Sequence, residues 1–98
     1  MALIRKPNVY CHMLATEYTD ANGGPRLTAG QVQTTIYETL TAATRDLRGF
    51  VKALHEGGHS NISDFTSDSL QSAVYWTDKW TGTRMKRWVA DLPFFTGD

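Results

Sequence analysis

His55, Glu56 and His59 are the residues whose types and spacing come closest to a chemical site. They match the pattern H-E-x-x-H, in which two histidines one helical turn apart bind zinc and the glutamate activates a water molecule. The two positions between them are Gly57 and Gly58, which together cost about 2 kcal/mol of helix propensity relative to alanine. These glycines also stand where the preceding helix is expected to end, and no third ligand with a helix of its own follows. We therefore expect a helix end with two exposed histidines, and no metal site.

Cys11 and His12 place a nucleophile next to a base. Adjacent side chains point away from each other on a helix and on a strand, so the two are not expected to act together. Cys11 is the only cysteine, which excludes an intramolecular disulfide and favours a buried, structural thiol in a reducing compartment. Residues 23–25 read Gly-Gly-Pro without the lysine and hydroxyl residue of a phosphate-binding loop, and predict a turn. The chain is therefore expected to be neither an enzyme nor a cofactor carrier.

A local group of cations is the best candidate for binding an anionic ligand. Arginine and lysine side chains can clamp phosphates, and a tryptophan can stack on a base for about 1–3 kcal/mol. The alternative is that the cations complement the dipole of a helix end and that the tryptophans belong to the core. The candidate ligand-binding residues are Lys79, Trp80, Arg84, Lys86, Arg87 and Trp88, with Arg26 as a further cation beside the N-terminal turn.

Length and charge limit the classes of protein that remain. The 98 residues are enough for one domain. Ten basic and ten acidic residues give a net charge of zero, so no global attraction draws the chain to a nucleic-acid polymer or an anionic membrane. The first residues are too weakly apolar for a signal peptide, and no apolar run is long enough to span a membrane. We expect a soluble, cytoplasmic protein without a membrane partner.

The clearest periodic signal predicts a long helix over residues 29–56. Its apolar residues follow steps of three and four, as one stripe of an α-helix does. Thr28 and Gln31 form a plausible capping box before it, and Gly57 is well placed as the left-handed residue that ends it. The stripe consists of Val32, Ile36, Leu40, Ala43, Leu47, Phe50, Val51 and Leu54.

A second helical pattern follows over residues 61–91. Ser60 is a suitable N-cap, while Thr66 or Ser67 would place the start later. Pro93 sets the far limit of this helix. Two long helices joined by a short polar turn are expected to be antiparallel neighbours.

Residues 8–19 fit neither periodicity well, because both faces of the segment mix polar and apolar residues. We favour a short helix that packs across the hairpin, since a lone strand needs a partner and the chain offers no second strand candidate. A strand completed by another subunit is the alternative. The expected architecture is all-α in a single domain of residues 1–98, with an N-terminal segment (1–28), a helical hairpin (29–92) and a tail (93–98).

The apolar residues of the second helix cover an arc too wide for one partner helix. A small chain without a closed core needs extra burial, so we expect a homo-oligomer. In the alternative, a compact monomer, the tryptophans pack on the N-terminal segment. The candidate interface residues are Ile62, Phe65, Trp76, Phe94 and Phe95.

The segment Leu70–Trp76, with Ser60 ten residues before it, resembles the second helix of the helical-hairpin family of phage proteins that sequester cyclic-nucleotide signals of bacterial defence. The resemblance extends from Ala43 to Arg84, although residues 60–65 lack the family's two basic side chains. It implies a helical hairpin, symmetric oligomers and nucleotide ligands between subunits.

These observations lead to two functional hypotheses. The first is a non-enzymatic, phage-like binding protein that antagonises a host defence or regulatory system by sequestering a small cyclic nucleotide. The second is a protein–protein inhibitor or interaction module that binds a host protein with an exposed aromatic helical face. In the second case Trp88, Phe94 and Phe95 would be the aromatic anchors.

Overall fold

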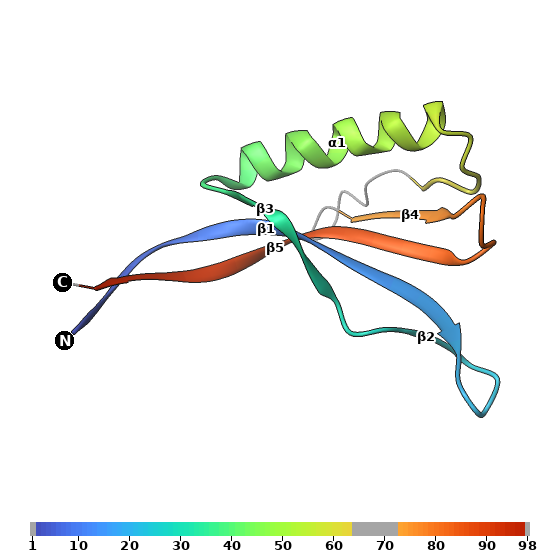
Figure 1. Cartoon of the computed structure of the whole chain (residues 1–98), viewed down its shortest axis with the longest axis horizontal. Helices are drawn as coiled ribbons and strands as arrows, with labels where there is room; N and C mark the ends of the chain where they lie inside the picture. The colour runs from blue at the N-terminus through green and yellow to red at the C-terminus, as the bar shows by residue number, and fades with distance from the viewer. Residues whose placement is uncertain (1, 64–72, 98) are drawn as a thin grey trace.

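A computed structural model describes residues 2–63 and 73–97 of the chain, which form a five-stranded antiparallel sheet and one helix. Figure 1 shows the helix lying along one face of the sheet. In chain order the elements are β1 (Leu3–Thr19), β2 (Pro25–Leu27), β3 (Gln31–Tyr37), α1 (Leu40–Glu56), β4 (Ala73–Thr77) and β5 (Arg84–Gly97).

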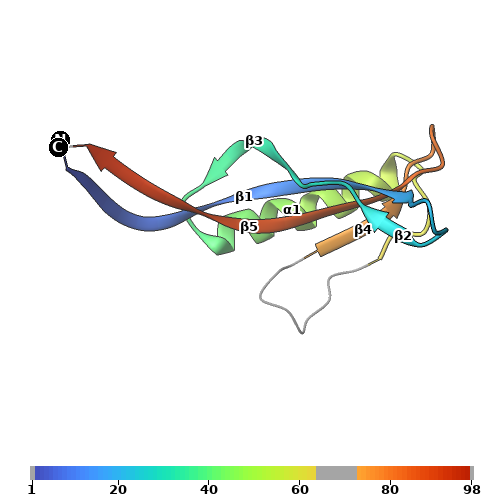
Figure 2. The same cartoon turned by 90° about the horizontal axis from the view of Figure 1, so that it is seen from below.

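Strand β1 is the centre of the sheet. β5 pairs with one of its edges over nearly the whole length, from Leu3↔Gly97 to Thr16↔Met85. β3 and β2 share the other edge, because β3 pairs with the middle of β1 and β2 with its end. β4 pairs with β5 and completes the order β2-β1-β5-β4 (Figure 2).

The all-α prediction and its helical hairpin are wrong. Residues 8–19, expected to form a short helix, belong to β1, and the second helix over 61–91 is replaced in the described residues by β4 and β5. The tail predicted over 93–98 is strand up to Gly97. The first helix is real but begins at Leu40 instead of residue 29, because β3 occupies residues 31–37.

The ends of α1 follow from local chemistry. Thr39 is the N-cap, and its hydroxyl oxygen accepts a hydrogen bond from the Ala42 amide at 3.1 Å. Thr28, the cap predicted from sequence, instead accepts from the Thr16 amide across the sheet. The helix ends at Glu56 as predicted, with Gly57 as its C-cap, but Gly57 is not left-handed: the residue with a positive φ is the next one, Gly58 at 79°.

The core lies between α1 and one face of the sheet. Ala43, Leu47 and Leu54 of the helix are buried against β4 and β5. The Phe50 and Trp76 rings meet edge to face, with centroids 5.1 Å apart. The sheet residues that complete this core are Val74, Trp76 and Val89.

Beyond the helix, β1 and β5 continue alone as a two-stranded ribbon (Figures 1 and 2). Its pairs run from Leu3↔Gly97 to Lys6↔Phe94. The register shifts between Lys6 and Val9, where Pro7 and Pro93 lie. Such an irregularity in the pairing tolerates proline, which has no amide hydrogen to donate. We call this ribbon, residues 3–6 and 94–97, the arm.

Candidate binding surface

The strand structure of β5 divides the predicted cation cluster between the two faces of the sheet. Successive side chains of a strand point to opposite faces. Met85 and Val89 contact the core under α1, so Arg87 shares their face. Arg84, Lys86 and Trp88 therefore lie on the opposite face, which we call the open face.

On the open face, cations and aromatic rings from β4 and β5 lie together. The Lys86 ammonium is 4.7 Å from the centroid of the Trp88 ring and 5.5 Å from that of Tyr75. The Arg84 guanidinium is 5.9 Å from the Tyr75 ring and also donates to the Asn61 carbonyl oxygen. Distances of this size are those of cation–π contacts. We call Tyr75, Arg84, Lys86 and Trp88 the cationic–aromatic patch.

The rest of the open face is largely apolar. Val32 and Ile36 of β3 pair across from Met13 and Cys11, and their side chains are 51% and 53% exposed. Cys11 itself is fully buried, as predicted. The exposed aliphatic side chains and the cationic–aromatic patch therefore share one face of the sheet.

Gly30 marks how closely the β2–β3 connection approaches this face. A β-carbon at Gly30 would lie 2.9 Å from the Met13 methyl group and from two ring carbons of Trp88. A side chain there would displace both residues. Because Gly30 has no side chain, the β2–β3 connection can pass close to the Trp88 indole on the open face.

Arg87, a predicted ligand-binding residue, makes contacts within the protein instead. Its Nε–H donates to His12 Nδ1 at 2.9 Å, and its guanidinium lies 4.5 Å from the Phe50 ring centroid. Because this nitrogen of arginine always carries a proton, His12 Nδ1 must accept. The His12 proton is therefore on Nε2, which donates to the Ala43 carbonyl oxygen at 2.8 Å.

This network joins β1, β3 and β5 to the helix. The His12 ring stacks on Tyr37, and the Tyr37 hydroxyl donates to the Asp46 carboxylate. Burial lowers the pKa of His12, and the nearby Arg87 charge lowers it further against the opposing effects of Ala43 and Asp46. Burial and the hydrogen bond to Asp46 raise the pKa of Tyr37 to about 12. Sequence reasoning missed this network because its residues come from four elements that lie far apart in the sequence.

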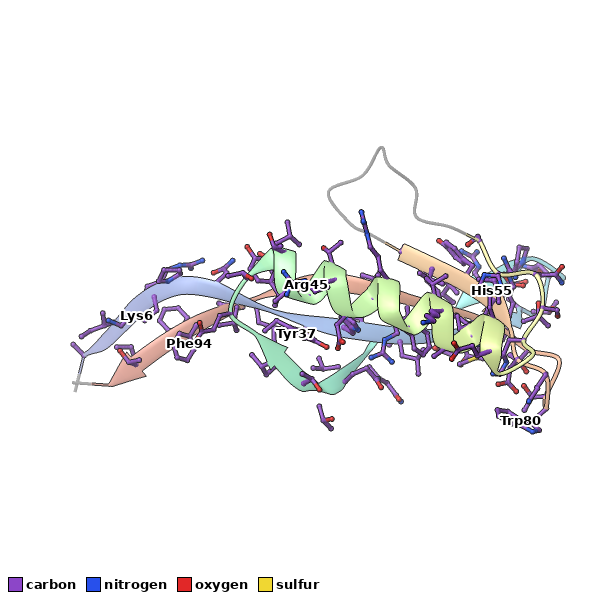
Figure 3. The ribbon with its side chains drawn as sticks, turned by 90° about the horizontal axis from the view of Figure 1, so that it is seen from above. Lys6, Tyr37, Arg45, His55, Trp80 and Phe94 are labelled. Atoms are coloured by element: carbon purple, nitrogen blue, oxygen red, sulfur yellow. The ribbon has the colours of Figure 1, made fainter. Side chains whose placement is uncertain are left out.

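The remaining predicted ligand residues lie apart from the patch. Trp80 is 77% exposed in the β4–β5 turn, with the Lys79 ammonium 4.7 Å from its ring centroid. Figure 3 places Trp80 at the end of the molecule opposite Lys6 and Phe94. Arg26 forms an ion pair with Asp20 at 2.9 Å in the turn after β1. Of the predicted cluster, the structure brings Arg84, Lys86 and Trp88 together on the open face, and Lys79 and Trp80 together in the β4–β5 turn.

The predicted interface residues are also dispersed. Trp76 is buried in the core and Ile62 packs against it. Phe94 and Phe95 are exposed on the arm. Phe65 lies outside the described residues.

The pattern from His55 to His59 does not lie on one helix. His55 is exposed in the last turn of α1, as predicted. His59, also predicted to be exposed, is half-buried: it follows the positive-φ Gly58, and its Nδ1 accepts from the Lys79 amide at 3.2 Å. Within residues 2–63 and 73–97, no three His, Cys, Asp or Glu side chains are grouped so that they could hold a metal ion. Cys11 and His12 point to opposite faces of β1, as expected of neighbours on a strand.

No family model, curated protein or solved structure matches this chain. In the part of the chain that the structure describes, the single helix, α1, is not long and apolar enough to cross a membrane.

Proposed function

We propose that this protein is a non-enzymatic protein-binding module that docks onto a partner protein through its open face. The observation that carries the proposal is the unequal covering of the sheet. One face packs under α1. On the other face Cys11, Ala15 and Ala73 are buried, whereas Val32 and Ile36 are exposed on the same face as the cationic–aromatic patch.

The composition of the open face favours a protein partner. An antiparallel sheet with one solvated face usually alternates apolar residues inward and polar residues outward. Here Val32 and Ile36 are exposed at outward positions, next to the half-buried Met13 and Trp88. Exposed apolar surface of this kind marks interaction sites, and tryptophan, tyrosine and arginine are the residues that most often anchor them.

The cations of the patch indicate the chemistry of the partner. Lys86 and Arg84 lie beside apolar and aromatic side chains, so a complementary surface would combine apolar groups with carboxylates. The proposal corresponds to the protein–protein inhibitor or interaction module expected from the sequence, with a sheet face in place of the expected helical face.

Two side chains that could act in catalysis, His12 and Cys11, are buried in the structure. Both ring nitrogens of His12 are hydrogen-bonded within the core. Cys11 is fully buried, and burial raises the pKa of its thiol, which disfavours the reactive thiolate. These contacts support a binding role.

Sequestration of a small nucleotide is the second candidate, and one observation favours it. The Lys86 ammonium lies between two aromatic rings, an arrangement that could hold a phosphate next to a stacked base. The Arg87 guanidinium would not take part, because it donates to His12 on the other face.

Site-specific photocrosslinking in cells that make the protein tests the proposal. A photoreactive residue at Ile36 should give one discrete adduct with a partner protein, because this side chain is exposed on the open face. The same residue at Lys52, exposed on the outer side of α1, is the matched control and should give none. Lys86→Glu should remove the Ile36 adduct by repelling the partner's carboxylates.

Equal adducts from both positions, or no adduct from Ile36, would contradict docking through the open face. If the patch holds a nucleotide instead, the Ile36 adduct is absent. Calorimetry with nucleotides then shows heat of binding that Lys86→Gln removes.

A further inference from the structure

The arm extends past every other element of the molecule. β3 first pairs with β1 at Tyr10, and β4 pairs with β5 only as far as Trp88. Among the described residues no third strand pairs with the arm, which consists of two strands (Figure 1). Its large apolar side chains, Leu3, Ile4, Phe94 and Phe95, are all exposed, and Leu3 is exposed by 69%.

A two-stranded ribbon alone is at best marginally stable in water. Burying one large apolar side chain contributes about 1.5–3 kcal/mol, so the arm gains most from a surface that covers these four residues. The radius of gyration is 15.8 Å. A compact chain of this length would have about 12.6 Å. The molecule thus projects apolar surface away from its own core.

The two edges of the arm differ in their suitability for strand pairing. Within the arm the β1 edge carries Arg5 and Lys6, and charged residues, lysine above all, protect an edge strand from pairing. The β5 edge from Phe94 to Gly97 carries no charge and no proline. The β5 edge is the one open to another strand.

We propose that two copies of this chain pair through the β5 edges of their arms, antiparallel and related by a two-fold axis. The two arms then form one four-stranded sheet in the order β1-β5-β5-β1. A two-fold axis lets one edge serve both copies, since each presents the same residues to the other. With Phe95 of one copy opposite Phe95 of the other across the axis, an aromatic cross-strand pair would stabilise this sheet.

The charges of the arm favour pairing of the two copies through β5 over pairing through β1. Pairing through β5 places the Arg5 and Lys6 pairs of the two copies on the outermost strands, whereas pairing through β1 would set like charges opposite each other. The net charge of zero leaves no long-range repulsion between copies. The interface uses none of the open face, so the dimer and the proposed partner binding are independent.

Light scattering of the full chain tests the dimer. The expected mass at micromolar concentration is about 22 kDa, twice the 11.0 kDa of one chain. Phe95→Lys should give a monomer, because it places a charge at the pairing edge. Ile4→Lys is the matched control: it makes the same kind of change on the other strand of the arm and should stay dimeric. A wild-type mass near 11 kDa at every concentration overturns the proposal.

Disulfide crosslinking identifies which edge of the arm pairs, and it does not depend on whether the lysine variants fold. Cys11→Ala removes the natural thiol, and single cysteines are then introduced by Phe95→Cys, Thr96→Cys or Ile4→Cys. Directly opposite Cα atoms of an antiparallel pair are about 4.5–5.5 Å apart, within the range that a disulfide bridges. A covalent dimer from Phe95→Cys supports the proposal, whereas Thr96→Cys, which this register sets opposite Phe94 of the other copy, should form little. Covalent dimers from Ile4→Cys alone overturn it.

Discussion

At the scale of single residues, His12 determines how the helix is held on the sheet. It is the one buried polar residue among those the structure describes. Its two ring nitrogens bond to Arg87 of β5 and to Ala43 of α1. A protonated ring would turn Nδ1–H toward the Arg87 Nε–H, so the fold requires the neutral form.

The lowered pKa of His12 predicts a loss of stability in acid. The unfolded chain takes up the proton near the ordinary pKa of 6.5, while the folded state takes it up only at lower pH. Below pH 6.5 the unfolded state therefore binds more protons, and the free energy of unfolding falls with falling pH. Urea unfolding at neutral pH and below pH 6 should show this decrease.

Two variants assign the acid effect to His12. His12→Gln should unfold more easily at neutral pH by about 1–3 kcal/mol, because a buried hydrogen bond is lost. It should also lose less stability than the wild type on acidification. His55→Gln, at the exposed end of α1, should keep the wild-type pH dependence. An unchanged pH dependence in His12→Gln would show that another group is responsible.

At the scale of elements, the part of the helical stripe from Ala43 to Leu54 was predicted correctly, since its buried members contact the core. The earlier part was not, because Val32 and Ile36 are four residues apart. A spacing of four puts two side chains on one face of a helix and equally on one face of a strand. Periodicity alone could not separate these two structures.

The long strands were missed for a second reason. β1 buries Cys11 toward the open face and His12 toward the helix, so its sequence shows no alternation of polar and apolar residues. Without a visible partner strand, β1 was interpreted as a helix, and β5 was interpreted as the end of another.

The start of α1 gives a prediction at this scale. Thr39→Ala should lower the free energy of unfolding by about 1 kcal/mol, because the Ala42 amide loses its cap. Thr41→Ala is the same chemical change inside the helix and should be neutral or slightly stabilising, since alanine has the higher helix propensity. Chemical denaturation of both variants measures the difference. Equal losses would place the start of the helix elsewhere.

At the scale of the whole molecule, the chain presents two separate surfaces. The open face carries the cationic–aromatic patch with Val32 and Ile36, and the arm carries an uncharged β5 edge. The sequence identified some residues of each surface, including Lys86, Trp88 and Phe95. It could not show which of them share a face, because that depends on the pairing of β5 with β1 and β4.

Thiol footprinting in an extract of the producing cells tests most directly whether the open face is the binding surface. In a Cys11→Ala background, Ile36→Cys should react with a maleimide much more slowly in the extract than in the purified protein, because the partner covers it. Lys52→Cys on the outer side of α1 should react at the same rate in both. Protection of Lys52→Cys together with full reactivity of Ile36→Cys would contradict binding through the open face.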